Sequence, residues 1–90
     1  MNTFHLTVST PDGNRFSDEA AGLYVRGAAG DLAVLAGHIP FVTAVQPGTC
    51  RIVLPDGSEK TARIDGGLLT VSAAGTTLLS GSFQFEDTAE

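Results

Sequence analysis

The chain has 90 residues, and its formal net charge is −5 because 10 Asp and Glu outnumber 5 Lys and Arg. At about 150 residues per domain, this length allows one small domain and excludes a two-domain enzyme. The acidic balance argues against nucleic acid as a partner, since phosphate binding needs clustered basic residues. A single cysteine, Cys50, excludes an internal disulfide and a zinc site built on several cysteines.

The first residues lack a basic start followed by an apolar run, so we expect neither a secretory signal nor a membrane-spanning helix. Residues 4–9 alternate apolar and polar side chains, which is typical of a half-buried strand. A Pro-Asp-Gly turn follows at 11–13. Residues 18–21 begin with two acidic side chains, as a helix can, but Gly22 and Val25 disfavour a longer helix. We interpret this segment as an irregular link or an edge strand.

Seven further short runs of strand-forming residues are each bounded by Gly, Pro or Asp. A hairpin is predicted across a second Pro-Asp-Gly turn at 55–57, because proline sets one turn angle and glycine accepts the positive one. Turns that recur about every 8–12 residues predict one all-β domain over residues 1–85, a β-sandwich or small barrel, with a polar tail at 86–90. The seven predicted strands cover 23–26, 32–35, 42–46, 49–54, 59–64, 68–72 and 76–80.

The sequence contains none of the short motifs that carry nucleotide, hydrolase or metal chemistry. A phosphate-binding loop, a dinucleotide-binding glycine pattern, a nucleophile elbow and a histidine pair at metal-ligand spacing are all absent. His5 and His38 could be combined with Asp31 or Asp65 into a triad, but any chain of this length offers such sets. Cys50 lies in an alternating strand and is interpreted as a buried thiol. We therefore expect no catalysis, no metal and no cofactor.

Lys60 raises a second hypothesis, because residues 59–62 are similar to the short motif around the modified lysine of lipoyl carrier domains. Those domains are all-β and of this size, and their swinging arm needs its lysine at the tip of a tight turn. Here the tip falls at 55–57, and Lys60 falls in the outgoing strand, where a solvated side chain is expected. A lipoyl-type carrier or a generic β-sandwich binding module stays open as the alternative.

The densest pattern spans residues 27–48, where a glycine-framed loop, a buried strand, a Gly-His-x-Pro turn and a second strand end at Pro-Gly. This spacing resembles the N-terminal domain of the epsilon subunit of bacterial and chloroplast F-type ATP synthases. The family pattern is Gly-x-x-Gly-x-Leu-x-x-Leu/Tyr-x-Gly-His-x-Pro-hydrophobic-hydrophobic-Thr. The flanking features follow in family order, from Phe4 and the turn at 11–13, through the hairpin at 51–57, to the glycine pair at 66–67. The likeness covers about residues 3–81.

The resemblance implies a ten-stranded β-sandwich, or flattened barrel, at the foot of the ATP synthase rotor. In the family this domain docks on the gamma subunit and on the ring of membrane c subunits, and so couples proton-driven rotation of the ring to ATP synthesis in the catalytic head. It is a non-catalytic domain, and no nucleotide is expected to bind to it. The implied location is peripheral, at the cytoplasmic face of the inner or another energy-transducing membrane, without direct membrane insertion.

The family's contacts carry over only to positions that match its motifs. Gly30 and Asp31 are implied to lie in the loop that contacts the c-ring, where Asp31 takes the place usually held by glutamate. Its carboxylate is expected to project from the turn, because Gly27 and Gly30 bracket that turn and can adopt positive φ. The residues implied to face gamma are Ser9, Thr10, His38, Thr43, Asp65, Gly66, Gly67 and Thr70.

Most epsilon subunits continue past the sandwich into a two-helix hairpin that can inhibit ATP hydrolysis. The residues after Ser82 are too few, and not patterned, for a pair of helices that needs roughly eight or more residues each. We therefore expect either a naturally short form or a shortened chain, without this inhibitory element.

Overall fold

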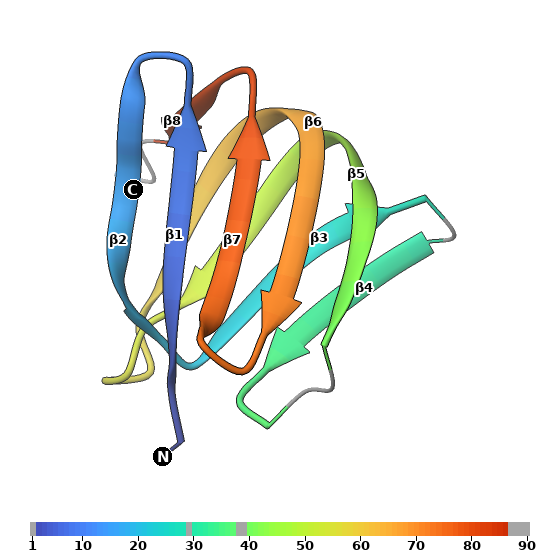
Figure 1. Ribbon diagram of the computed structural model, residues 1–90. Coiled ribbons are helices and arrows are strands. Elements are labelled where there is room, and N and C mark those ends of the chain that lie inside the picture. Colours follow the sequence, from blue (N-terminus) through green and yellow to red (C-terminus); the bar gives the residue numbers. More distant parts are fainter. Residues whose placement is uncertain (1, 29, 38–39, 87–90) are drawn as a thin grey trace.

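The computed structural model describes residues 2–28, 30–37 and 40–86, which form an all-β structure (Figure 1). No helix long and apolar enough to cross a membrane occurs in these three ranges. The eight strands found there are β1 (Phe4–Thr10), β2 (Gly13–Ala20), β3 (Gly22–Gly27), β4 (Gly30–Leu35), β5 (Phe41–Val53), β6 (Glu59–Ser72), β7 (Gly75–Ser80) and β8 (Phe83–Phe85).

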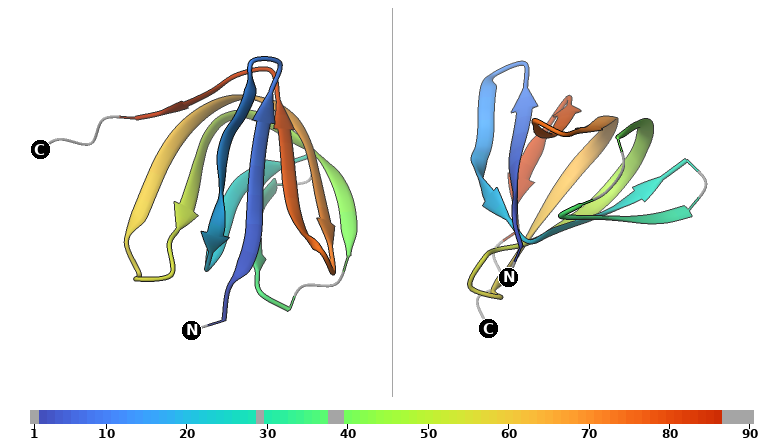
Figure 2. Two further views of the ribbon diagram at one scale, coloured as in Figure 1. Left: turned by 60° about the vertical axis from the view of Figure 1, so that its left-hand side comes forward. Right: turned by 60° about the horizontal axis from the view of Figure 1, so that its bottom comes forward.

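The strands form one continuous hydrogen-bonded sheet in the order β2-β1-β7-β6-β5-β3-β4, with β8 also paired to β6. β1 and β7 run parallel, and the other neighbours run antiparallel. The sheet folds over on itself because β5 and β6, at 13 and 14 residues, are long and strongly bent (Figures 1 and 2). The result is a sandwich whose two layers share their middle strands.

Each layer contains five strand segments. Layer 1 consists of β2, β1, β7, residues 67–72 of β6 and residues 41–45 of β5. Layer 2 consists of β4, β3, residues 47–53 of β5, residues 59–65 of β6 and β8. The β3–β4 hairpin extends away from β1, β2 and β7, as seen in Figure 1 and in the right-hand view of Figure 2.

A single hydrophobic core fills the space between the layers, and both layers contribute alternate residues to it. Each fully buried Leu or Ile contributes about 1.5–3 kcal/mol relative to an exposed side chain, so this core is the main source of stability. Its largest fully buried side chains are Leu6, Val8, Leu23, Val34, Cys50, Ile52, Leu69 and Leu78.

The predicted all-β sandwich is confirmed, but the described residues form eight strands instead of ten. The predicted strands at 42–46 and 49–54 are one strand, β5, and those at 59–64 and 68–72 are one strand, β6. Gly66 and Gly67 bend β6 between the layers with φ of 94° and 149°, values that L side chains rarely adopt. Counting each bent strand once in each layer gives the ten positions of the expected sandwich.

Candidate functional site

The outer face of layer 1 is a broad, nearly uncharged surface. Cross-strand registers pair Leu68 with Leu79 and Thr70 with Thr77, while the intervening Leu69 and Leu78 point into the core. Alternate residues of each strand therefore face outward together. This surface, called here the hydroxyl-leucine face, consists of Thr7, Ser9, Ser17, Val42, Ala44, Leu68, Thr70, Ser72, Thr77 and Leu79.

Three large apolar side chains stand out on this face. Val42 is 60% exposed, Leu79 47% and Leu68 43%. Leu68 and Leu79 are direct cross-strand partners, and Val42 lies on the neighbouring strand, opposite Thr70. Apolar side chains gathered on one flat, charge-poor face are typical of a protein-binding surface.

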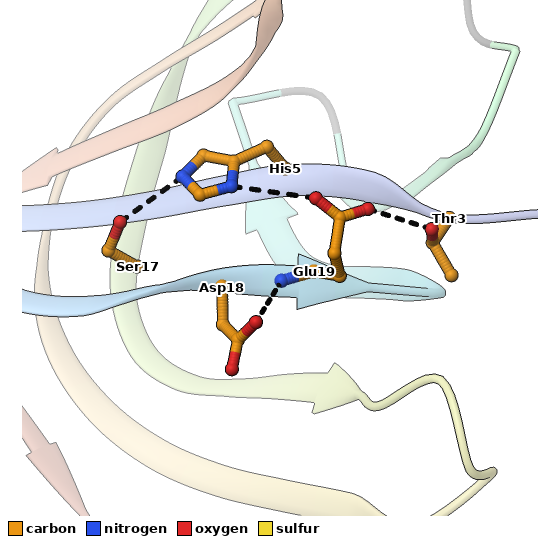
Figure 3. Close-up of polar contacts among 5 residues, drawn as sticks. All are labelled: Thr3, His5, Ser17, Asp18 and Glu19. Atoms are coloured by element: carbon orange, nitrogen blue, oxygen red, sulfur yellow. Dashed lines mark hydrogen bonds and ion pairs between the residues drawn. The ribbon is translucent and has the colours of Figure 1, made fainter.

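A polar cluster borders the hydroxyl-leucine face along β1 and β2 (Figure 3). His5 Nε2 lies 3.1 Å from Ser17 Oγ, and His5 Nδ1 lies 3.5 Å from Glu19 Oε2. Thr3 Oγ1 donates to Glu19 Oε1 at 2.8 Å. This connectivity matches that of a hydrolytic triad, but His5 and Glu19 are about half exposed on an open sheet surface. Triad chemistry needs a water-excluding site with preorganised oxyanion donors, so the cluster is better explained as edge-strand pairing.

The outer face of layer 2 has the opposite character, because ion pairs lie across it. Arg26 pairs with Asp31 at 3.4 Å, Arg51 with Glu59 at 3.5 Å, and Arg63 with Glu86 at 3.6 Å. Charged residues of both signs keep a face solvated, and charged residues are depleted at the centre of protein interfaces. The two faces of the sandwich are therefore chemically distinct.

The residues predicted to bind gamma do not all lie on one surface. Ser9 and Thr70 lie on the hydroxyl-leucine face. Thr43 is opposite the buried Leu69, so it points inward at the edge of layer 1, where it is half-buried. His38 lies outside the described residues.

The other predicted gamma-facing residues lie at the β1–β2 turn and at the bend of β6 between the two layers, near the top of Figure 1. Thr10 Oγ1 accepts from Asp12 N and lies 3.3 Å from Gly13 O, within the β1–β2 turn. Asp65 Oδ1 accepts from Ser82 N at 3.1 Å and from Ser80 Oγ at 3.0 Å. Asp65 thus holds the β7–β8 turn.

Gly66 and Gly67 are also needed for the fold. A Cβ at Gly66 would lie 2.8 Å from Val45 O, and a Cβ at Gly67 would overlap Leu79 O. Both glycines therefore have structural roles that explain their presence without a partner.

The predicted c-ring residues lie at the end of the β3–β4 hairpin. Gly27 pairs with Gly30, and Arg26 pairs with Asp31. Gly30 has a φ of 131° and sits in open space. The Asp31 side chain is 82% exposed and projects from the hairpin, and its ion pair with Arg26 was not foreseen.

The reactive side chains singled out in the sequence have ordinary structural positions. Cys50 is fully buried, and burial raises the pKa of its thiol to about 11, so the nucleophilic thiolate is disfavoured. Lys60 lies in β6 opposite Ile52, with its Nζ 5.5 Å from the centre of the Phe85 ring. It is not at the 55–57 tip, where a lipoylated lysine would have to be. The described part of the chain contains no group of three or more His, Cys, Asp or Glu that could hold a metal ion.

Comparison with known proteins gives a consistent family. Residues 3–86 match the family described as ATP synthase, Delta/Epsilon chain, beta-sandwich domain. The ATP synthase epsilon chain of Delftia acidovorans is 38% identical over 80 residues, which is 89% of this chain and 58% of the relative. The chain thus spans somewhat more than half the length of this curated relative.

Two solved structures share the fold. A chain of the Euglena gracilis mitochondrial ATP synthase, a structure that includes F1 and the c-ring, matches 98% of this chain and 56% of its own, with a TM-score of 0.88 at 22% identity. A chain of the Tetrahymena thermophila mitochondrial ATP synthase central stalk and c-ring matches 88% and 63%, with a TM-score of 0.71 at 14% identity. On the match over residues 3–86, the chain belongs to the ATP synthase delta/epsilon family and carries its β-sandwich domain.

Proposed function

We propose that this protein is an epsilon subunit of the ATP synthase central stalk, and that the hydroxyl-leucine face is its docking surface for the gamma subunit. The observation that carries this proposal is the contrast between the two outer faces. The outer face of layer 1 exposes Val42, Leu68 and Leu79 with almost no charge, whereas layer 2 has ion pairs across its outer face and two exposed apolar side chains, Leu35 in β4 and Phe85 in β8. Family membership supplies the complex in which such a face would be covered.

The energy available from this face fits a stable but modest contact. Burying a Val or Leu completely contributes about 1.5–3 kcal/mol, and these three side chains are already about half buried. Their remaining surface would contribute roughly 1 kcal/mol each, or about 3 kcal/mol together, before other contacts are counted. Ser9 and Thr70 would add hydrogen bonds around this apolar centre.

The c-ring contact is assigned to Gly30 and Asp31 at the end of the β3–β4 hairpin. Asp31 is the most exposed carboxylate among the described ion pairs, so it can exchange its Arg26 partner for a basic group on the ring at low cost. The domain would then join the ring to gamma, so that ion-driven rotation of the ring turns gamma. Its role is mechanical, without catalysis or nucleotide binding, at the cytoplasmic face of an energy-transducing membrane.

Co-purification with the gamma subunit of the same organism tests the docking face. Leu79→Asp and Leu68→Asp should each abolish or strongly weaken the complex, because burying an unpaired charge costs several kcal/mol. Gln84→Asp is the matched control, since Gln84 is exposed and pairs with Arg63 on the outer face of layer 2. Circular dichroism and thermal melts should show that all three variants fold.

Two results would contradict the proposal. If both leucine variants bind gamma as tightly as Gln84→Asp does, the hydroxyl-leucine face is not the docking surface. A mass increase on Lys60 from lipoylation would instead support the carrier function.

A further inference from the structure

The first part of β5 forms an edge of layer 1. β3 pairs with residues 51–53 of β5 and then only with Val45, opposite Gly27. Residues 42–44 pair with β6 on one side, and among residues 2–28, 30–37 and 40–86 no strand pairs with them on the other. A strand edge of this kind presents backbone N–H and C=O groups that can pair with another chain.

This edge lacks the features that protect the other edges of the sandwich. β2 has a bulge at Arg15 and carries Asp18 and Glu19, β8 is only three residues long, and β4 carries the exposed Asp31. Residues 42–44 are Val-Thr-Ala, with neither charge nor proline, and their register with β6 is unbroken. Because native proteins protect exposed edges with charges, bulges or short strands, an edge without them favours the addition of a strand.

The position of this edge matches the hydroxyl-leucine face. Val42 and Ala44 belong to that face, and Val42 is 60% exposed, more than any other large apolar side chain that the structure describes. The edge is therefore one border of the face, and a partner that covers the face reaches it directly. Its length is sufficient, because β8 shows that three residues can pair with this sheet.

We propose that the gamma subunit adds a short extended segment to β5 at residues 42–44, as an extra strand of layer 1. This contact rests on the docking face proposed above and extends it from side chains to backbone. The added segment supplies ladder hydrogen bonds to the β5 edge. Its side chains on the side of Val42 and Ala44 are apolar and uncharged, because they cover an apolar, charge-free border.

Amide hydrogen exchange, read residue by residue by nuclear magnetic resonance, tests this contact on the complete chain with and without gamma. Successive N–H groups of a strand point to opposite sides, so the free chain should show fast exchange at one of residues 42 and 43. Gamma should slow this amide at least about tenfold. The amides on the free edge of β2, at the opposite border of the same face, are the control and should keep their rates. No slowing at residues 42–44, or equal slowing at both edges, would overturn the added strand.

A proline at the fast-exchanging position removes the N–H group that the added strand needs, and an edge strand tolerates proline where its N–H faces solvent. Val42→Pro or Thr43→Pro, chosen by the exchange rates, should bind gamma about tenfold more weakly than Val42→Ala or Thr43→Ala, which keep the N–H. Thermal melts should show that the variants fold. Equal affinities of the proline and alanine variants would overturn the added strand.

Leu79→Asp separates this contact from the docking face itself. If Leu79→Asp abolishes gamma binding while the proline variant binds as the alanine variant does, gamma docks on the face without adding a strand. If Leu79→Asp binds gamma normally, the docking face is wrong and the added strand with it. Exchange at residues 42–44 that slows with rising concentration of the chain alone would assign the edge to a second copy of this chain instead.

Discussion

Replacing Asp65 by alanine should destabilise the fold, because the carboxylate holds together the turn that links β7 and β8. Asp65 Oδ1 lies 3.1 Å from Ser82 N and 3.0 Å from Ser80 Oγ. Hydrogen bonds to a charged acceptor contribute about 1.5–3 kcal/mol when well formed, and less where water competes. The Ser80 hydroxyl also lies 2.6 Å from Gly66 O and so keeps an alternative partner.

These contacts set the size of the effect. We expect Asp65→Ala to lower the free energy of unfolding by about 1 kcal/mol, because the Ser82 amide is exposed and water can replace its lost acceptor. For a domain of this length, 1 kcal/mol corresponds to a Tm shift of about 4–8 °C, so the melting temperature should fall by about that amount. The Asp65→Asn variant keeps an acceptor oxygen but not the charge, so its free energy of unfolding should fall by about half as much as that of Asp65→Ala.

Thermal unfolding followed by circular dichroism measures this effect, with Asp31→Ala as the control. Asp31 has one long ion pair and an 82% exposed side chain, so its removal should change the stability by less than about 1 kcal/mol. If Asp65→Ala melts at the same temperature as Asp31→Ala, the carboxylate does not hold the turn. Its presence would then be better explained by the gamma contact expected from the family resemblance.

Three further predictions concern the bend, the buried thiol and the hairpin end. Gly67→Ala should lower the free energy of unfolding by more than about 3 kcal/mol in urea, since its Cβ would overlap Leu79 O. Gly57→Ala, at positive φ but in open space, should lower it by only about 1–2 kcal/mol, and equal losses of stability would contradict the role of the bend. Burial raises the pKa of the Cys50 thiol from 9.0 to about 11, so between these pH values the folded state retains a proton that the unfolded state loses. The free energy of unfolding should therefore be unaffected by this group below pH 9 and fall by roughly 2–3 kcal/mol towards pH 11. A Cys50→Ala variant with the same pH dependence would refute this. Asp31→Arg should weaken ATP-driven proton pumping in reconstituted vesicles at low salt, while leaving the Tm and gamma binding nearly unchanged. Equal pumping with the Asp31→Arg variant and with the unmodified protein would remove Asp31 from the ring contact.

The sequence predicted those strands that bury one face and whose apolar and polar side chains alternate. The ends of β1 and β7 each lie within one residue of the predicted ends, because the side chains of these strands themselves show the period of two. Most of β2 was missed, since it is an edge strand with few buried positions and its structure depends on pairing with β1. The three-residue β8 was missed because it is too short to show a period.

Local signals could not separate the end of a strand from a bend in one. Glycine and proline at 47–48 and 66–67 were interpreted as strand ends, yet β5 and β6 continue through them. The same freedom of φ permits both outcomes, and only the pairing of β5 with β6 along their whole length decides between them.

The candidate docking face was only partly accessible from the sequence. Ser9 and Thr70 were identified through the family resemblance, but Leu68 and Leu79 were assigned to strands without a face. A signal was present, because Leu68-Leu69 and Leu78-Leu79 place apolar side chains on both sides of a strand, and only one of each pair can enter the core. Which one remains exposed depends on the register with the neighbouring strands.

The continuous course of β5 and β6 bears directly on the proposed mechanical role. The β3–β4 hairpin carrying Asp31 joins layer 1 chiefly through β5, which pairs with β3 in layer 2 and passes unbroken into layer 1. A load applied at Asp31 would therefore reach the hydroxyl-leucine face along a hydrogen-bonded strand pair and through a close-packed core, which resists compression. Loosening the bend at Gly66 and Gly67 should then weaken coupling between hairpin and docking face before it weakens either contact alone.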